Sequence, residues 1–301
     1  MQLPEHVRRA IEERAERVGF AALKSAATQM SQAYRQGRAA CFGEAYLVTR
    51  MPATYAAAYS VLREVRARLG AEIASVLDIG AGTGAASLAA RAWFPDASVT
   101  MLERDPALSE AARCWLPEAA VITDDATRAP LPPHDLIMAA YSLSELRAPM
   151  AQRLWAAARV ALVAIEPGTR QGFALIRGLR AELLEAGAHM VAPCPAGTPC
   201  PMAEPDWCHF AARVERSSLH RRIKDGELGY EDEKFSYAAL ARRAATAAEA
   251  RVIRRPQHQP GLITMQTCTP GGLGTERVSR RNREAFRLAR RIAWGDAWGT
   301  V

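Results

Sequence analysis

The chain has 301 residues, 49% of them hydrophobic, and carries a net charge of +7 from 39 Lys and Arg against 32 Asp and Glu. This length and composition allow a full hydrophobic core, enough for one large domain and an appendage, in a soluble protein. No run of eighteen uncharged apolar residues occurs, which excludes a membrane-spanning helix of ordinary length.

The first seventy residues are predicted to be helical. Apolar positions recur at spacings of three and four over 4–36 and 52–69, for example at Val61 and Val65. We expect these segments to form a helical N-terminal cap over residues 1–70. The N-terminal stretch lacks the apolar core of a secretory signal, so we expect a cytoplasmic, reducing location without disulfides.

After Gly70 the pattern changes to alternating strands and helices. Apolar strand-like runs are expected at 75–80, 98–103, 120–123, 135–141 and 160–166. Helices are expected at 85–93, 106–114, 149–157 and 171–187. Five buried runs separated by helices predict a parallel sheet covered on both faces, a Rossmann-like α/β fold.

A glycine loop lies at the first strand-to-helix junction. Residues 77–84 read Leu-Asp-Ile-Gly-Ala-Gly-Thr-Gly. Gly80, Gly82 and Gly84 allow a tight turn and close approach to a ligand, while the helix that follows presents free backbone amides. This context predicts a nucleotide-type cofactor site.

Three acidic residues lie at the ends of the first two expected strands and just after the third. Asp78 is placed to accept from a ligand amine, Glu103 to bind a ribose diol, and Asp124 to accept from an adenine amine. S-adenosylmethionine is favoured because this cofactor contains no pyrophosphate that the loop would have to bind. A nicotinamide cofactor remains an alternative, since Ala85 completes G-x-G-x-x-A, and so does an empty vestigial pocket.

Four of the six cysteines suggest a metal site. Cys194, Cys200 and Cys208 lie within one stretch of fifteen residues that is rich in proline. The strand expected at 261–268 would bring Cys268 back beside them. Four thiolates suit tetrahedral zinc or an iron-sulfur cluster. The alternatives are small buried thiols, disulfides, or a cysteine nucleophile.

The basic charge is concentrated near the C-terminus. Residues 209–301 hold 18 Lys and Arg against 10 Asp and Glu, which favours a polyanionic partner such as nucleic acid. Seven arginines within fifteen residues are dense enough to follow a phosphate backbone. They are Arg277, Arg280, Arg281, Arg283, Arg287, Arg290 and Arg291. A merely solvated basic face is the alternative.

These features predict a division of the chain. We expect the Rossmann-like domain over 71–192 and 238–275, a Cys-rich metal-binding insertion over 193–237, and a basic tail over 276–301 that is helical between 276 and 298.

Several motifs together resemble one family. They are RMPATYAA at 50–57, VLDIGAGTG at 76–84, SLSEL at 142–146, IEPGT at 165–169, the PC…PCP loop, DWCHF at 206–210, KDGELGYEDEKFSY at 224–237 and WGD at 294–296. In these motifs the chain is similar to the ribosomal small-subunit protein twenty-two family, called methyltransferase-like protein seventeen in animals. Its members assist assembly of the mitochondrial small ribosomal subunit and have bacterial relatives.

The resemblance implies a class I S-adenosylmethionine-dependent methyltransferase fold and contact with small-subunit rRNA, in a protein otherwise monomeric. It implies that Asp78, Gly80, Gly82 and Glu103 line the cofactor pocket. It also implies that Cys194, Cys200, Cys208 and Cys268 hold a [4Fe-4S] cluster, with structural zinc as the alternative.

Catalysis itself is left open. Amino-methylating enzymes often carry a D/N/S-P-P-Y/F motif after the fourth strand, where this chain has Ala140-Tyr141-Ser142-Leu143. No catalytic residue is therefore assigned, and a non-catalytic assembly factor remains the second hypothesis.

Overall fold

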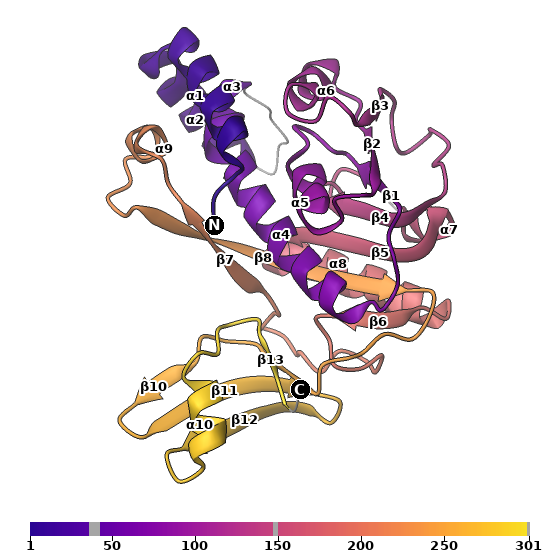
Figure 1. Cartoon of the computed structure of the whole chain (residues 1–301), viewed down its shortest axis with the longest axis vertical. Coiled ribbons are helices and arrows are strands. Elements are labelled where there is room, and N and C mark those ends of the chain that lie inside the picture. The colour runs from indigo at the N-terminus through magenta and orange to yellow at the C-terminus, as the bar shows by residue number, and fades with distance from the viewer. Residues whose placement is uncertain (36–42, 147–149, 300–301) are drawn as a thin grey trace.

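The computed structural model describes residues 1–35, 43–146 and 150–299. Within these residues the strands form two sheets, one of eight strands and one of five. Figure 1 shows the smaller sheet as a separate layer below the larger one. Strand order in the larger sheet is β3-β2-β1-β4-β5-β8-β6, and β7 also pairs with β8.

The first five strands of the larger sheet are parallel, as the apolar runs predicted. They are β1 (Ser75–Ile79), β2 (Ser98–Leu102), β3 (Ala120–Ile122), β4 (His134–Ala140) and β5 (Ala158–Pro167). The chain proceeds outward from β1 to β3 and then returns to place β4 on the other side of β1. This reversal makes the carboxyl ends of β1 and β4 a topological switch point, where α/β sheets bind ligands.

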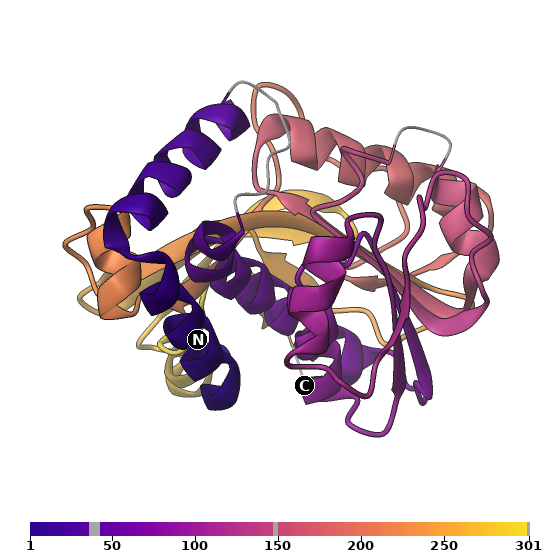
Figure 2. The ribbon, with the colours of Figure 1, turned by 90° about the horizontal axis from the view of Figure 1, so that it is seen from above.

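Helices cover both faces of this sheet, as Figure 2 shows from above. One face carries α4 (Met51–Arg68), α5 (Ala85–Trp93) and α6 (Pro106–Arg113), and the other carries α7 (Met150–Ala157) and α8 (Arg170–Glu185). Successive strand residues alternate between the two layers. Val76 packs in the core with α4 and α5, whereas Leu77 packs with α7 and α8. The fold is Rossmann-like α/β.

The N-terminal cap is helical, as expected, but the run predicted over 4–36 is interrupted. It forms α1 (Glu5–Val18) and α2 (Phe20–Arg35), separated by Gly19 at φ 83°. Glycine adopts this positive φ readily because it has no Cβ to clash, so the helix ends there. A short α3 (Glu44–Thr49) precedes α4. Residues 36 and 149, at the ends of two expected helices, lie outside the described residues.

An antiparallel strand, β8 (Tyr230–Ala241), lies between β5 and β6 (His189–Ala192). Its first half also pairs with β7 (Phe210–Glu215), and α9 (Ser218–Ile223) lies between β7 and β8 in the chain. β8 therefore runs through the boundary expected at residue 237. The polar letters of 224–240 hid this strand, because it is charged up to Lys234 and buried only from Phe235 onward.

The C-terminal part forms the second sheet rather than a helical tail. It contains β9 (Ala250–Val252), β10 (Gln257–Gln259), β11 (Leu262–Thr269), β12 (Gly272–Ser279) and β13 (Ala297–Trp298). The strand expected at 261–268 is thus β11, in the second sheet. The helix expected over 276–298 is limited to α10 (Arg283–Ala289), because Val278 belongs to β12 and packs against Ile263 and Met265. Residues 300 and 301 lie outside the described part.

Across the described ranges, no helix combines the length and the apolar character needed to cross a membrane.

Candidate functional site

The glycine loop between β1 and α5 is held against the neighbouring strand β2. The backbone N–H groups of Gly80 and Ala81 both donate to the carbonyl of Leu102, at 2.8 and 3.1 Å. Gly80, Gly82 and Gly84 adopt φ values of 66°, 55° and 75°. Such angles strain residues with a side chain, so this turn requires glycine.

Gly80 also lets two loops touch at the switch point. A Cβ built on Gly80 would lie 2.7 Å from the Cβ of Ser142, in the loop after β4. Ser142 in turn donates its hydroxyl to the carbonyl of Ile79 at 2.8 Å. The loops that follow β1 and β4 are therefore in direct contact.

Glu103 closes the glycine loop on one side. Its carboxylate accepts from the backbone N–H of Gly82 at 2.8 Å and of Asp105 at 2.9 Å. Its own N–H donates to Ile122 at the end of β3, two residues before the exposed Asp124. The structure thus places Glu103 and Asp124 on adjacent strand ends beside the loop.

Asp78 lies beneath the loop rather than at its surface. It is 1% exposed, and it accepts a 2.7 Å hydrogen bond from the hydroxyl of Ser87 on α5. Burial raises the pKa of Asp78 to about 6, although the bonds from Ser87 act in the opposite direction. Its position allows it to fix the start of α5 against β1.

A charged network that the sequence did not predict borders the same strand ends. Arg50, at the start of α4, donates two hydrogen bonds to Glu233 on β8, at 3.1 and 3.0 Å. The hydroxyl of Tyr141 donates to the same carboxylate at 2.9 Å. Tyr141 adopts φ 60°, a strained angle for a non-glycine residue, and such strain tends to occur at functional sites.

Glu166, at the end of β5, is another residue of this region that the sequence did not indicate. It is completely buried, and Oε1 accepts from the N–H of Leu143 at 2.8 Å. Its Oε2 has no hydrogen-bond partner among the described residues. Burial raises the pKa of Glu166 to about 7. The only sequence signal for Glu166 was its position inside the IEPGT motif.

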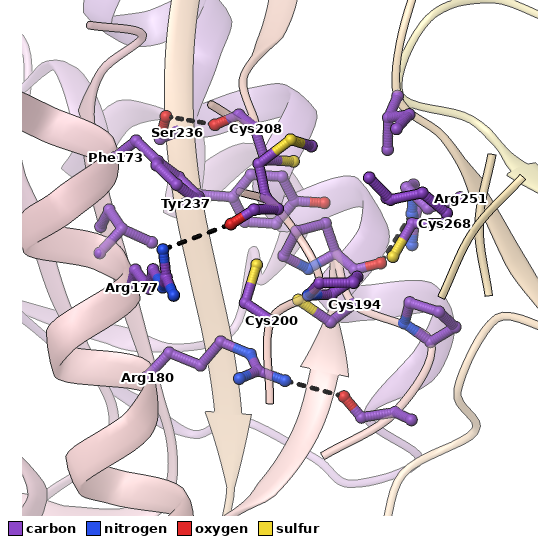
Figure 3. Close-up of a pocket in the computed structure, with 18 of the residues that line it drawn as sticks. Phe173, Arg177, Arg180, Cys194, Cys200, Cys208, Ser236, Tyr237, Arg251 and Cys268 are labelled. Atoms are coloured by element: carbon purple, nitrogen blue, oxygen red, sulfur yellow. Dashed lines mark hydrogen bonds between the residues drawn. The ribbon is translucent and has the colours of Figure 1, made fainter. Parts of the chain in front are cut away.

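The four predicted cysteines line one cavity. Cys194 and Cys200 lie on the loop after β6, Cys208 lies just before β7, and Cys268 lies on β11 of the second sheet. The cavity has about 720 Å³ of empty space, part of it open to solvent. Figure 3 shows the labelled cysteines between α8 and the second sheet. The fold thus gathers all four sequence-predicted thiols.

The thiols influence one another. Burial raises the pKa of Cys194, that of Cys208 well above its usual value, and that of Cys268 to about 11. Charge on neighbouring cysteines raises each of the three further. Among the described residues, no group of three or more His, Cys, Asp or Glu side chains is arranged to hold a metal ion.

The predicted arginines lie on the second sheet and beside α10. All of them are exposed: Arg277 on β12, Arg280 and Arg281 between β12 and α10, Arg283 and Arg287 on α10, and Arg290 and Arg291 after it. None forms an ion pair with a carboxylate in the part of the chain described here. Their charges are therefore available to an external partner.

Comparison with known proteins identifies one sequence family. The profile of the family described as "Mitochondrial small ribosomal subunit Rsm22" matches residues 41–299. A search of curated proteins finds no match.

Solved structures give distant similarities. The plantazolicin methyltransferase BpumL, in complex with SAH, is 11% identical with a TM-score of 0.43, covering 79% of this chain and 100% of its own. The magnesium protoporphyrin IX methyltransferase of Synechocystis is 12% identical with a TM-score of 0.38, covering 68% and 86%. The precorrin-6y C5,15-methyltransferase of Geobacter metallireducens is 17% identical with a TM-score of 0.39, covering 62% and 86%.

Proposed function

This chain belongs to the Rsm22 family, and from that membership we propose that it is an S-adenosylmethionine-dependent methyltransferase-like protein that acts on or binds small-subunit rRNA during ribosome assembly. The observation that carries the proposal is the glycine loop at the switch point of the sheet. Gly80 contacts Ser142 there, and Glu103 closes the loop beside the start of α5.

The loop residues fit S-adenosylmethionine in distinct roles. Each carboxylate oxygen of Glu103 accepts one backbone N–H and keeps a lone pair for a ribose hydroxyl. Asp124 is exposed on the next strand end, where an adenine amine would lie. Gly82 would bring the backbone close to the cofactor, whereas Gly84 is buried against the side chains of Ala112, Met101 and Leu116. Asp78 supports the loop from below through Ser87.

The exposed arginines of the second sheet support an RNA partner. Unpaired guanidinium groups attract phosphates at long range, and their binding weakens steeply with salt. The family description links its members to the small ribosomal subunit, so small-subunit rRNA is the partner that we propose.

We further propose that the four cysteines hold a [4Fe-4S] cluster. The donor set fits, because four thiolates can each bind one iron of the cluster. A tetrahedral zinc with Zn–S bonds of about 2.3 Å requires sulfurs about 3.8 Å apart, a tighter arrangement than a cluster needs. The gathering of all four thiols around one cavity supports a shared inorganic group at this place.

Labelled methyl transfer tests the enzyme hypothesis. The protein is incubated with methyl-labelled S-adenosylmethionine and small-subunit particles from a strain that lacks it. We expect label in the rRNA with the native chain, reduced at least tenfold by Glu103→Ala and retained by Glu110→Ala, an exposed residue of α6. Cofactor binding without transfer would favour the non-catalytic assembly factor.

Metal analysis tests the cluster hypothesis. Protein purified without oxygen should be brown and contain about four irons and four sulfides per chain. Cys208→Ser should lower that content, whereas Cys114→Ser should leave it unchanged, because Cys114 is an exposed thiol outside the cavity. Colourless protein with one zinc per chain would overturn the iron assignment.

A further inference from the structure

Arg180 is a buried cation whose charge no carboxylate balances. It lies on α8, is 5% exposed, and forms no ion pair with an acidic residue of the described chain. Its Nη2 donates to the carbonyls of Ala196 and Thr198 at 3.0 and 2.6 Å. Its Nε is buried and has no partner among the described residues. A buried guanidinium requires compensation, because removing it from water is unfavourable.

The charge of Arg180 remains unbalanced on the side of the cysteine cavity. Arg180 lines the cavity together with the four cysteines, and Figure 3 shows it beside Cys194 and Cys200. A buried cation at this position favours negative charge on a group bound by the four sulfurs.

Two other arginines near the thiols have their own partners. Arg251 also lines the cavity, but its Nη1 lies 2.7 Å from the carboxylate of Glu64. Arg254 forms an ion pair with Asp206. Arg177 also lines the cavity, but it is exposed to solvent. Among these arginines, Arg180 is the buried one without an acidic partner in the described chain.

We propose that Arg180 is the counter-cation of the group held by the four cysteines and that it sets the reduction potential of that group. The inference rests on the proposed cluster. A [4Fe-4S] core of charge +2 bound by four thiolates carries −2, and one electron taken from an external reductant makes it −3. A fixed buried cation with a free N–H stabilises the more negative state, so it raises the potential.

A redox titration of the purified, cluster-containing protein with dithionite tests this role. Arg180→Gln removes the charge, and Arg180→Lys keeps it while removing the guanidinium N–H groups. Arg159→Gln is the control, because it removes the same charge at an exposed position on β5 that does not line the cavity. Potentials are followed by the loss of visible absorption and by the signal of the reduced cluster in electron paramagnetic resonance.

We expect a more negative midpoint for Arg180→Gln, an intermediate one for Arg180→Lys, and the native value for Arg159→Gln. A native midpoint in both Arg180 variants would overturn the role of Arg180 while leaving the cluster assignment intact. If Arg180→Gln folds but loses its iron, the midpoint of Arg180→Lys decides. Absence of iron from the native protein would instead overturn the proposed cluster, and the inference with it.

Discussion

Arg251 and Glu64 join the two sheets through an ion pair of 2.7 Å. Arg251 lies on β9 of the second sheet, and Glu64 lies on α4, which packs on the first. Arg251 is 1% exposed, and it also donates to the carbonyls of Pro193 and Gly295 at 2.9 and 2.8 Å. One side chain thus connects the helical layer, the cysteine loop and the C-terminal segment. The register partner of Arg251 on the neighbouring strand β11 is Cys268.

Replacing this buried cation should loosen the contact between the sheets. We expect Arg251→Met to lower the free energy of unfolding by about 3 kcal/mol, the lower end for breaking a buried pair, because Arg68 still pairs with Glu64. Urea unfolding measures the change. Arg255→Met is the control, since Arg255 is 73% exposed and its pair with Asp232 should contribute less than about 1 kcal/mol. Equal losses in both variants would contradict the role of Arg251.

The glycine loop gives a second test, through its contact with the loop after β4. The methyl group of an alanine at position 80 would lie 2.7 Å from the Cβ of Ser142. The alanine would also have to adopt the positive φ of Gly80. We expect Gly80→Ala to weaken binding of S-adenosylmethionine by at least tenfold in isothermal titration calorimetry.

Gly178→Ala is the matched control for this change. Gly178 lies inside α8 with no atom within 4 Å of its added methyl, so alanine there should stabilise the helix by up to about 1 kcal/mol. Its cofactor affinity should equal that of the native chain. Unchanged affinity in Gly80→Ala would remove the loop from the cofactor site.

The parallel half of the fold was predictable because each of its strands and helices has its own local sequence pattern. Strands buried on both faces appear as short apolar runs, such as 76–79 and 136–140, and the helices between them carry their own periodicity. β8 was missed because its charged half pairs only with β7, and its buried half pairs with β5 and β6. Nothing within a few residues of Tyr230 indicates that arrangement.

Around the glycine loop, the site was predictable only where one segment supplies it. The glycine loop and Glu103 follow strand ends directly, so spacing indicated them. Arg50 and Glu233 are 183 residues apart, and only the folded chain shows that they meet. Arg180 looks like an ordinary basic helical residue, because burial by a distant loop leaves no local pattern.

The network around Glu233 should matter for stability. Glu233→Gln leaves Arg50 without a charged partner, although the side chain of Arg50 is only 25% exposed. We expect a loss of about 2 kcal/mol in the free energy of unfolding, because charged hydrogen bonds are lost from a partly buried site. Glu227→Gln, at an exposed position before β8, should change it by less than about 0.5 kcal/mol. Similar unfolding curves for both variants would contradict this role.

RNA binding should depend on the exposed arginines of α10 and the residues after it. The double variant Arg287→Gln with Arg291→Gln should bind a small-subunit rRNA fragment more weakly. The slope of log affinity against log salt should fall by about 1.4, since each phosphate contact on single-stranded RNA contributes about 0.7. Arg159→Gln with Arg243→Gln removes two exposed charges elsewhere and should preserve the slope. Filter binding at several salt concentrations distinguishes the two results.

The buried carboxyl of Glu166 should make stability depend on pH. Burial raises its pKa in the folded chain to about 7 from a value near 4.5. The folded state therefore binds more protons than the unfolded state between those values, and this contribution to stability is lost as pH rises through them. Glutamine cannot titrate, yet its carbonyl can still accept from the N–H of Leu143.

Relative to the native chain, Glu166→Gln should therefore gain stability between pH 5 and pH 8. The expected gain is up to about 3 kcal/mol, since one pKa unit corresponds to about 1.4 kcal/mol. Urea unfolding at each pH gives the difference. Glu185→Gln, at an exposed position on α8, should follow the native pH profile. A Glu166→Gln variant that also follows the native profile would show that the buried carboxyl stays ionised throughout this range.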